Sequence, residues 1–242
     1  MTPVPLISIT GLVKSYPAPQ PLRIANLSVA GDDRVVLSGL DEGAAEMFVH
    51  LVTGAALPEE GVVSIAGRDT RAISTDTEWL TSLDQFGIVT RRAVLLDTLS
   101  VAANLALPRT LSIDPMPADV RARAGQDAAD VGLAAGRVDG PVSALSELER
   151  VRLHLARAAA NGPRLVLLEH PTAALDEKAE SRTFGETLRA FSTARGFGWV
   201  AISNDDEFAR GAGGKRLRLD TASGKVTPDR RSWLSQLLGN KP

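Results

Sequence analysis

Short apolar runs bounded by polar or glycine residues make up the first third of the chain. Residues 6–9 alternate between apolar and polar side chains, and residues 22–29 resemble a second strand of this kind. Residues 34–37 form an apolar run that ends at Ser38-Gly39, and residues 61–67 form another between two glycines. Runs of this length and pattern predict strands. Residues 44–53 predict the helix that follows the run at 34–37.

The rest of the chain has a segment of mostly helical pattern, followed by a segment in which strands and helices alternate. Residues 79–160 are expected to be mostly helical, and residues 118–131 carry charges separated by alanines, as a solvated helix does. Strands and helices then alternate again. The expected elements are a strand at 165–168, a helix at 177–195, a strand at 199–203, a closing hairpin over 217–226 and a short amphipathic tail at 232–238. This alternation predicts a mainly parallel sheet covered on both faces.

Composition then narrows the classes of function. The 242 residues include 27 basic and 29 acidic side chains, so we expect no broad electrostatic attraction to nucleic acid. Cysteine is absent, which excludes disulfides, thiolate catalysis and thiolate metal sites. The sequence has no apolar run of about 18 residues and no signal peptide, so we expect no membrane span and a cytoplasmic location.

Two motifs in the second half of the chain carry the strongest functional signal. Four apolar residues at 165–168 lead into Glu-His-Pro-Thr at 169–172 and then into Ala-Ala-Leu-Asp at 173–176. Upstream, Leu-Ser-Glu-Leu-Glu at 145–149 opens a helix that ends in Ala-Arg-Ala at 156–158. In order and spacing, these segments resemble the ATP-binding-cassette ATPases, the nucleotide-binding subunits of ABC transporters. That family has Leu-Ser-Gly-Gly-Gln in the upstream segment, and Asp-Glu-Pro-Thr followed by Ala-Leu-Asp in the downstream one.

The resemblance covers about residues 4–228 and implies a fold. We expect a P-loop-type α/β core with an N-terminal antiparallel β part and an inserted helical lobe. Residues 1–242 then form a single nucleotide-binding domain, because no internal repeat or long linker divides them. The core takes about residues 1–78 and 161–228, the helical lobe about 79–160, and a C-terminal tail 229–242. Residues 98–108 look most like the lipoprotein-release and macrolide-export branch of the family.

The resemblance also places a phosphate-binding loop after the strand at 34–37. Such a loop has the pattern Gly, four residues, Gly-Lys-Ser/Thr, so that backbone N–H groups, a lysine and a Mg²⁺ ligand surround the phosphates. Alanine stands here at both the lysine and the Mg²⁺-ligand positions, and none of the five lysines lies between residues 38 and 53. The positions that contact ATP in the family are occupied by Ser38, Gly39, Gly43, Ala44 and Ala45.

Three carboxylates have been added to this loop and the helix turn after it, those of Asp41, Glu42 and Glu46. A carboxylate about 4 Å from a phosphate charge costs roughly 4 kcal/mol near a protein surface. The lost lysine contact removes about another 1.5–3 kcal/mol. Acidic residues at a helix N-terminus also satisfy the helix dipole without a ligand. The family implies ATP and Mg²⁺ as cofactors, but we expect a self-capped strand–turn–helix that binds them weakly or not at all.

The other catalytic positions of the family are substituted as well. Glu169 stands where an Asp orders the Mg²⁺ water shell, and it keeps a carboxylate. His170 stands where a Glu orients the attacking water; it is either a base that works near pH 7 or a packed histidine. Asn204 replaces the switch histidine. Arg91 takes the Q-loop glutamine position. Its side chain has only hydrogen-bond donors, so it cannot ligate Mg²⁺. It belongs either to a solvated basic turn or to a contact with an acidic partner loop.

The signature segment keeps Ser146 but has Glu-Leu-Glu at 147–149 in place of Gly-Gly-Gln. Two carboxylates and a leucine there would repel and obstruct a γ-phosphate held by the opposite subunit. Ser146 is alternatively the N-cap of the helix, with Glu149 completing a capping box. Two family features are retained: Tyr16 at the adenine-stacking position, and Asp176, which in the family contacts the partner subunit.

Together the substitutions favour a non-catalytic role on a preserved fold. We expect a structural or regulatory subunit of an ABC transporter, peripheral on the inner face of the cell membrane, with no metal site of its own and no nucleic-acid partner. Its partners would be a transmembrane subunit and a second cassette, in a homodimer or a heterodimer. Two alternatives stay open. One is an active ATPase that uses Glu169, His170 and Tyr16 in an altered geometry, and the other is a free-standing binding module outside transport.

Overall fold

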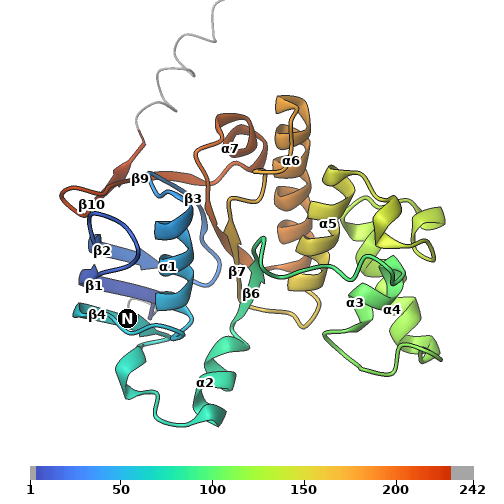
Figure 1. Ribbon diagram of the computed structural model, residues 1–242, viewed down its shortest axis with the longest axis horizontal. Helices are drawn as coiled ribbons and strands as arrows, with labels where there is room; N and C mark the ends of the chain where they lie inside the picture. The colour runs from blue at the N-terminus through green and yellow to red at the C-terminus, as the bar shows by residue number, and fades with distance from the viewer. Residues whose placement is uncertain (1–3, 230–242) are drawn as a thin grey trace, which may run out of the picture.

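The computed structural model describes residues 4–229, which form two β-sheets with helices around them (Figure 1). The first sheet has the strand order β2-β1-β4-β5, and all its neighbouring strands are antiparallel. Its strands are Ile7–Lys14 (β1), Leu22–Val29 (β2), Glu60–Ile65 (β4) and Arg68–Asp69 (β5). The expected N-terminal antiparallel β part is therefore confirmed.

The second sheet has six strands in the order β10-β9-β3-β8-β7-β6. Five of them, β9, β3, β8, β7 and β6, are parallel to one another, and β10 forms an antiparallel hairpin with β9. This confirms the mainly parallel sheet and the closing hairpin. The strands are Arg34–Ser38 (β3), Phe86–Val89 (β6), Leu165–Glu169 (β7), Gly198–Ile202 (β8), Lys215–Asp220 (β9) and Lys225–Pro228 (β10).

Apolar clusters cover both faces of the six-stranded sheet. On β7, Leu165 and Leu167 belong to one cluster, with α1 and the antiparallel sheet, whereas Val166 and Leu168 belong to the other, with the helical lobe and α6. Successive strand residues point to opposite faces, so an apolar run such as this one is buried on both. The helices are Glu42–Val52 (α1), Asp76–Leu83 (α2), Val101–Ala106 (α3), Ala118–Asp130 (α4), Glu147–Ala158 (α5), Lys178–Arg195 (α6) and Asp206–Ala212 (α7).

Short 3-10 turns complete the helical elements, at Thr70–Ala72, Ala135–Arg137 and Val142–Ala144. Figure 1 shows α1 beside the antiparallel sheet, and α3 and α4 at the opposite end of the molecule, beyond α5. No helix within residues 4–229 has the length and hydropathy needed to cross a membrane.

One expected boundary needs correction. The segment 79–160 was expected to be mostly helical, but it contains β6, an edge strand of the core sheet. The indole Nε1 of Trp79, on α2, donates to the Thr53 carbonyl at the end of α1, so α2 contacts the core as well. The helical lobe therefore starts after Val89 rather than at residue 79. The amphipathic tail expected at 232–238 lies outside the described residues.

Candidate functional site

The candidate site lies at the carboxyl edge of the parallel strands, where ligands bind in open α/β sheets. Ser38 ends β3, Glu169 ends β7, and the loops after β6 and β8 carry Arg91 and Asn204. Because these strands are neighbours in the sheet and run in the same direction, the fold brings together residues that are far apart in the sequence. The phosphate-loop positions, Glu169, Arg91 and Asn204 therefore belong to one edge of the sheet.

The turn after β3 caps its own helix. Asp41 is the N-cap of α1, and its Oδ1 accepts a hydrogen bond from the backbone N–H of Ala44 at 2.8 Å. Glu42 adds a second carboxylate to the first turn. The side chains of Ala44 and Ala45 face the core, with exposed fractions of 1% and 0%. The expected self-cap is therefore present, and it satisfies a helix donor with a protein side chain.

Asn204 also uses the polar backbone of this turn. Its Oδ1 accepts from the Gly39 N–H at 2.9 Å, and its Nδ2 donates to the Leu40 carbonyl at 3.3 Å. Ser38 Oγ donates to the Leu217 carbonyl on β9 at 3.3 Å. The residue at the family's switch-histidine position thus ties β8 to the loop after β3 through uncharged hydrogen bonds.

Two adjacent arginines after β6 pair with the carboxylates of the site. The guanidinium of Arg92 forms two hydrogen bonds to the Glu169 carboxylate, from Nη2 to Oε2 at 2.8 Å and from Nη1 to Oε1 at 3.3 Å. The same Nη1 lies 3.0 Å from Oε2 of Glu46 on α1. Thr90 Oγ1 donates to Glu169 Oε2 at 3.2 Å. Arg92 therefore joins β7 to α1 through two carboxylates.

Arg91, the residue at the Q-loop glutamine position, makes a more exposed pair. Its Nη1 lies 3.0 Å from Oε1 of Glu42, and the two side chains are 69% and 75% exposed. Arg92 and Glu169 are 42% and 8% exposed, so Arg92 makes the more buried interaction. Sequence reasoning assigned a role to Arg91 and none to Arg92. The available signal was a pair of arginines directly after a parallel strand, at the same sheet edge as four carboxylates.

Tyr16 lies against the turn that begins α1. A Cβ added at Gly43 would lie 3.1 Å from Tyr16 Cε2, so the glycine lets the ring approach the helix backbone. Burial, and secondarily the charge of Asp41, raises the pKa of the Tyr16 phenol. Beside the ring is a hollow of about 390 Å³, lined by Tyr16, Ala18, Pro19, Gln20, Pro21, Leu22, Gly39, Asp41, Ala44 and Thr221.

His170 is held in an unusual backbone conformation. Its φ is +41°, in the left-handed region that few residues other than glycine adopt, and its N–H donates to the Ile202 carbonyl at 2.9 Å. Its Nε2 is buried and has no hydrogen-bond partner within residues 4–229. Glu169 and His170 share a hollow of about 100 Å³ with Glu147 of the signature segment and with Arg91.

The signature segment borders the smaller hollow through Glu147, whereas Ser146 lines neither hollow. Ser146 caps α5 through its side chain and Glu149 returns a bond to the Ser146 N–H, so the alternative reading of Ser146 as part of a capping box is confirmed. Glu149 is also paired with Arg137. Asp176 is exposed and belongs to neither hollow. Within residues 4–229, no group of three His, Asp or Glu side chains is arranged to hold a metal ion.

Solved structures share this architecture. The cbiO1 protein from Clostridium perfringens, part of the ABC transporter complex cbiONQ, matches with a TM-score of 0.78 at 15% identity, over 96% of this chain and 92% of that one. The dimeric cassette MJ0796 in a post-hydrolysis state, bound to ADP and Pi, matches with a TM-score of 0.71 at 23% identity, over 91% and 96%. The fold is thus that of an ATP-binding cassette, as expected.

The family follows from the sequence itself. The model of the ABC transporter family matches residues 46–173, which are 128 of the 242 residues, and the chain belongs to that family. A macrolide export ATP-binding/permease protein MacB from Burkholderia cenocepacia is 28% identical over 232 residues, covering 93% of this chain and 33% of that protein. MacB 1 from Aeromonas hydrophila is 27% identical over 232 residues, covering 94% and 35%. The chain spans about a third of the length of these relatives. They confirm the expected resemblance to the macrolide-export branch.

Proposed function

We propose that the chain is a non-catalytic ATP-binding cassette of an ABC transporter, with a structural or regulatory role beside a cassette that hydrolyses ATP. The observation that carries this proposal is Arg92, whose guanidinium joins Glu169 at the end of β7 to Glu46 on α1. Glu169 stands at a family Mg²⁺ position, and Glu46 lies on the helix that follows the phosphate-loop positions. The guanidinium of Arg92 pairs with both carboxylates, so the site is complete without nucleotide.

The residues present do not fit Mg·ATP. Glu169 is the only carboxylate at a family Mg²⁺ position, and it is 8% exposed and already accepts from Arg92 and Thr90. At the turn before α1, Asp41 would set a negative charge against a phosphate. Like charges about 4 Å apart cost about 4 kcal/mol near a protein surface. Both contributions oppose nucleotide binding, and no lysine side chain offsets them.

The donors of the phosphate loop are also used by the protein. In a phosphate loop, successive backbone N–H groups point at the anion. Here the Gly39 N–H donates to Asn204 and the Ala44 N–H donates to Asp41. Tyr16 packs against Gly43 from the side, so this glycine accommodates an aromatic ring. We expect Mg·ATP binding to be weak or absent for these reasons.

The proposed partners are a transmembrane subunit and a second, competent cassette, with the chain held on the inner face of the membrane. The curated relatives are named as combined ATP-binding and permease proteins, and about two thirds of their length lies outside the match. Asp176, at the family's dimer-contact position, is exposed and free to serve that role. The exposed Glu147 would face a phosphate loop of the partner. In a homodimer this would set Glu147 near Asp41 and Glu42, so a heterodimer is the proposed state.

Hydrolysis by the isolated assembly tests this proposal. The chain is purified with its membrane partners, and ATP turnover is compared for the unmodified assembly, Glu169→Gln and His170→Asn. Asparagine tolerates the left-handed backbone at position 170, so the second variant keeps the local structure. Turnover is expected to stay within about twofold, because neither residue acts on nucleotide. A loss of about a hundredfold in a folded Glu169→Gln assembly would contradict the proposal.

The second candidate function is an ATPase with altered residues. It is favoured by His170, whose Nε2 has no partner within residues 4–229 and which lies next to Glu169 in the same hollow. In that case His170→Asn would lower turnover, and Tyr16→Ala would weaken nucleotide binding. A chain that purifies as a monomer without any membrane partner would instead favour a free-standing binding module.

A further inference from the structure

Four charged side chains form a compact cluster where the helical lobe meets the long helix α6. Asp127 is at its centre and only 1% exposed. Arg195 Nη2 lies 2.7 Å from Asp127 Oδ1, and Arg195 Nε donates to Asp130 Oδ2 at 2.8 Å. Arg109 Nη2 lies 2.7 Å from Asp127 Oδ2, as an ion pair too bent to count as a hydrogen bond. We name Arg109, Asp127, Asp130 and Arg195 the latch cluster.

The members of the latch cluster come from separate parts of the fold. Asp127 and Asp130 lie in the last turn of α4, in the helical lobe. Arg195 is the last residue of α6, which packs on the core sheet. Arg109 follows α3, and its Nη2 also donates to the Ala160 carbonyl at 2.6 Å, in the segment that returns from α5 to β7. Arg195 therefore ties the lobe to α6 on the core, and Arg109 ties the end of α4 to the segment that leaves the lobe for β7.

Charge and burial make these contacts mutually dependent. Two guanidinium groups face two carboxylates, so the cluster is neutral only when all four side chains are in place. An ionised carboxylate as buried as that of Asp127 is tolerated only with its partners present. Arg195 also stacks over the Phe191 ring, with its guanidinium carbon 5.4 Å from the ring centroid. Burial opposes the charge of Arg195, but the two aspartates raise its pKa above the usual value.

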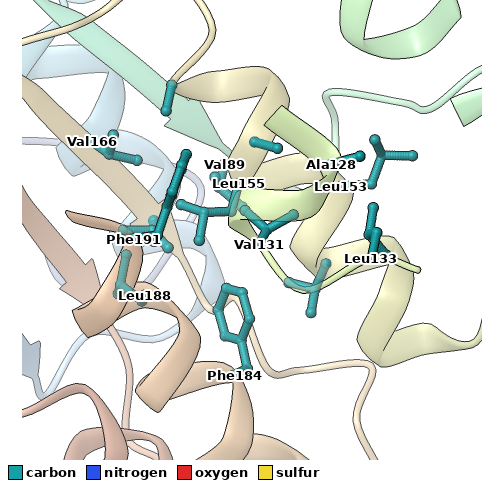
Figure 2. Packing of buried hydrophobic residues seen from close by; sticks show 14 of the residues in the cluster. Val89, Ala128, Val131, Leu133, Leu153, Leu155, Val166, Phe184, Leu188 and Phe191 are labelled. Atoms are coloured by element: carbon teal, nitrogen blue, oxygen red, sulfur yellow. The ribbon is translucent and has the colours of Figure 1, made fainter. Parts of the chain in front are cut away.

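The apolar contacts beneath the latch cluster run without interruption from the lobe into the core. Val131 and Leu133, just after α4, belong to the same buried cluster as Phe184 and Leu188 of α6. Figure 2 shows Val131 between Leu133 on one side and Phe184, Leu188 and Phe191 of α6 on the other. The ion pairs thus lie at one edge of the packed interface between the helical lobe and α6.

We propose that the latch cluster fixes the helical lobe against the core, so that the two move as one rigid body whether or not a ligand is present. The ion pairs of the latch cluster join side chains of the chain itself. This inference is independent of the proposed function, since it concerns a surface away from the phosphate-loop residues.

A distance measurement tests it directly. The sequence contains no cysteine, so Ala118→Cys on α4 and Ser28→Cys on β2 give a unique pair of exposed positions for spin labels. With the latch cluster intact, we expect one narrow distance distribution. Asp127→Asn keeps the shape of the side chain but removes its charge. We expect it to broaden the distribution and to speed hydrogen exchange in α4 by about tenfold or more.

The matched control is Asp139→Asn, which removes an exposed pair between Asp139 and Arg121 of the same helix, with side chains 71% and 47% exposed. It should change neither the distance distribution nor the exchange. If Asp127→Asn does not fold, Arg195→Gln serves in its place, because Arg195 is 34% exposed and lies at a helix end. A broad or two-peaked distribution in the chain with an intact latch cluster would overturn the proposal. So would an unchanged distribution and unchanged exchange in Arg195→Gln.

Discussion

Replacing Arg92 with glutamine tests the central interaction of the candidate site. The side chain forms two hydrogen bonds to Glu169, at 2.8 and 3.3 Å, and a further contact to Glu46 at 3.0 Å. Glu169 is 8% exposed, so Arg92→Gln leaves a nearly buried carboxylate without its counter-charge. Glutamine keeps an NH2 donor group and most of the volume of the arginine stem, so the change acts mainly on charge.

The magnitude follows from the burial of each partner. Hydrogen bonds to charged groups contribute about 1.5–3 kcal/mol, and removing one partner of a fully buried pair costs about 3–5 kcal/mol. Arg92 is 42% exposed, which lets water screen the pair, and Thr90 remains as a donor to Glu169. We therefore expect Arg92→Gln to lower the free energy of unfolding by about 2 kcal/mol. For a chain of this length, that is a fall in Tm of roughly 4–8 °C.

Arg91→Gln is the matched control, because it is the adjacent residue and changes the same charge. Arg91 and Glu42 are 69% and 75% exposed, so the expected loss is below about 0.5 kcal/mol. Urea unfolding followed by tryptophan fluorescence measures both variants, and Glu169→Gln completes a double-mutant cycle with Arg92→Gln. A positive coupling of about 1–2 kcal/mol is expected. Equal costs for the two arginine variants, or no coupling between Arg92 and Glu169, would refute the reasoning.

Three further predictions concern stability at other positions. Burial, together with the charges of Arg157 and Arg150, lowers the pKa of His154 from 6.5 to about 4. The unfolded chain therefore binds a proton that the folded chain excludes, and stability should fall by up to about 3 kcal/mol as pH drops from 6.5 to 4, by denaturation at each pH. His154→Leu should flatten that dependence; an unchanged slope contradicts the assignment. Ser146→Ala removes the capping box of α5 and should lower the free energy of unfolding in urea by about 1 kcal/mol. An unaltered urea midpoint would argue against the cap. Ala44→Lys places a charge at a position that is 1% exposed, so it should lower the free energy of unfolding by more than about 2 kcal/mol. It should also create no nucleotide affinity measurable by calorimetry; tight binding would show that only the lysine was missing.

Much of the fold could be predicted because its signals are local. The strand at 22–29 and the buried run at 165–168 are placed by apolar pattern alone, and both appear where expected. Helix caps are equally local: Asp41 and Ser146 each accept from a backbone N–H three residues on. The strand Phe86–Val89 was missed within a segment expected to be mostly helical, since four residues between helices give little periodicity.

The chemistry of the site could be predicted only in part, because its main contacts are long-range. Arg92 and Glu169 are 77 positions apart, and the sequence indicates at most that both follow strands of the same sheet, not that they pair. The positive φ of His170 likewise has no clear sequence signal, because such values are uncommon for any residue other than glycine. The loss of the family's lysine can be read from the sequence. The pairing of Arg92 with Glu169 can be seen only in the structure, because it depends on the sheet that places β6 beside β7.

The central claim is that the chain's own side chains complete the site where related cassettes hold nucleotide. Calorimetric titration of the purified chain with Mg·ATP tests it most directly. The account predicts no saturable heat up to about 1 mM ATP, the range in which ordinary substrate affinities lie. A dissociation constant in the micromolar range, weakened by Tyr16→Ala, would contradict it.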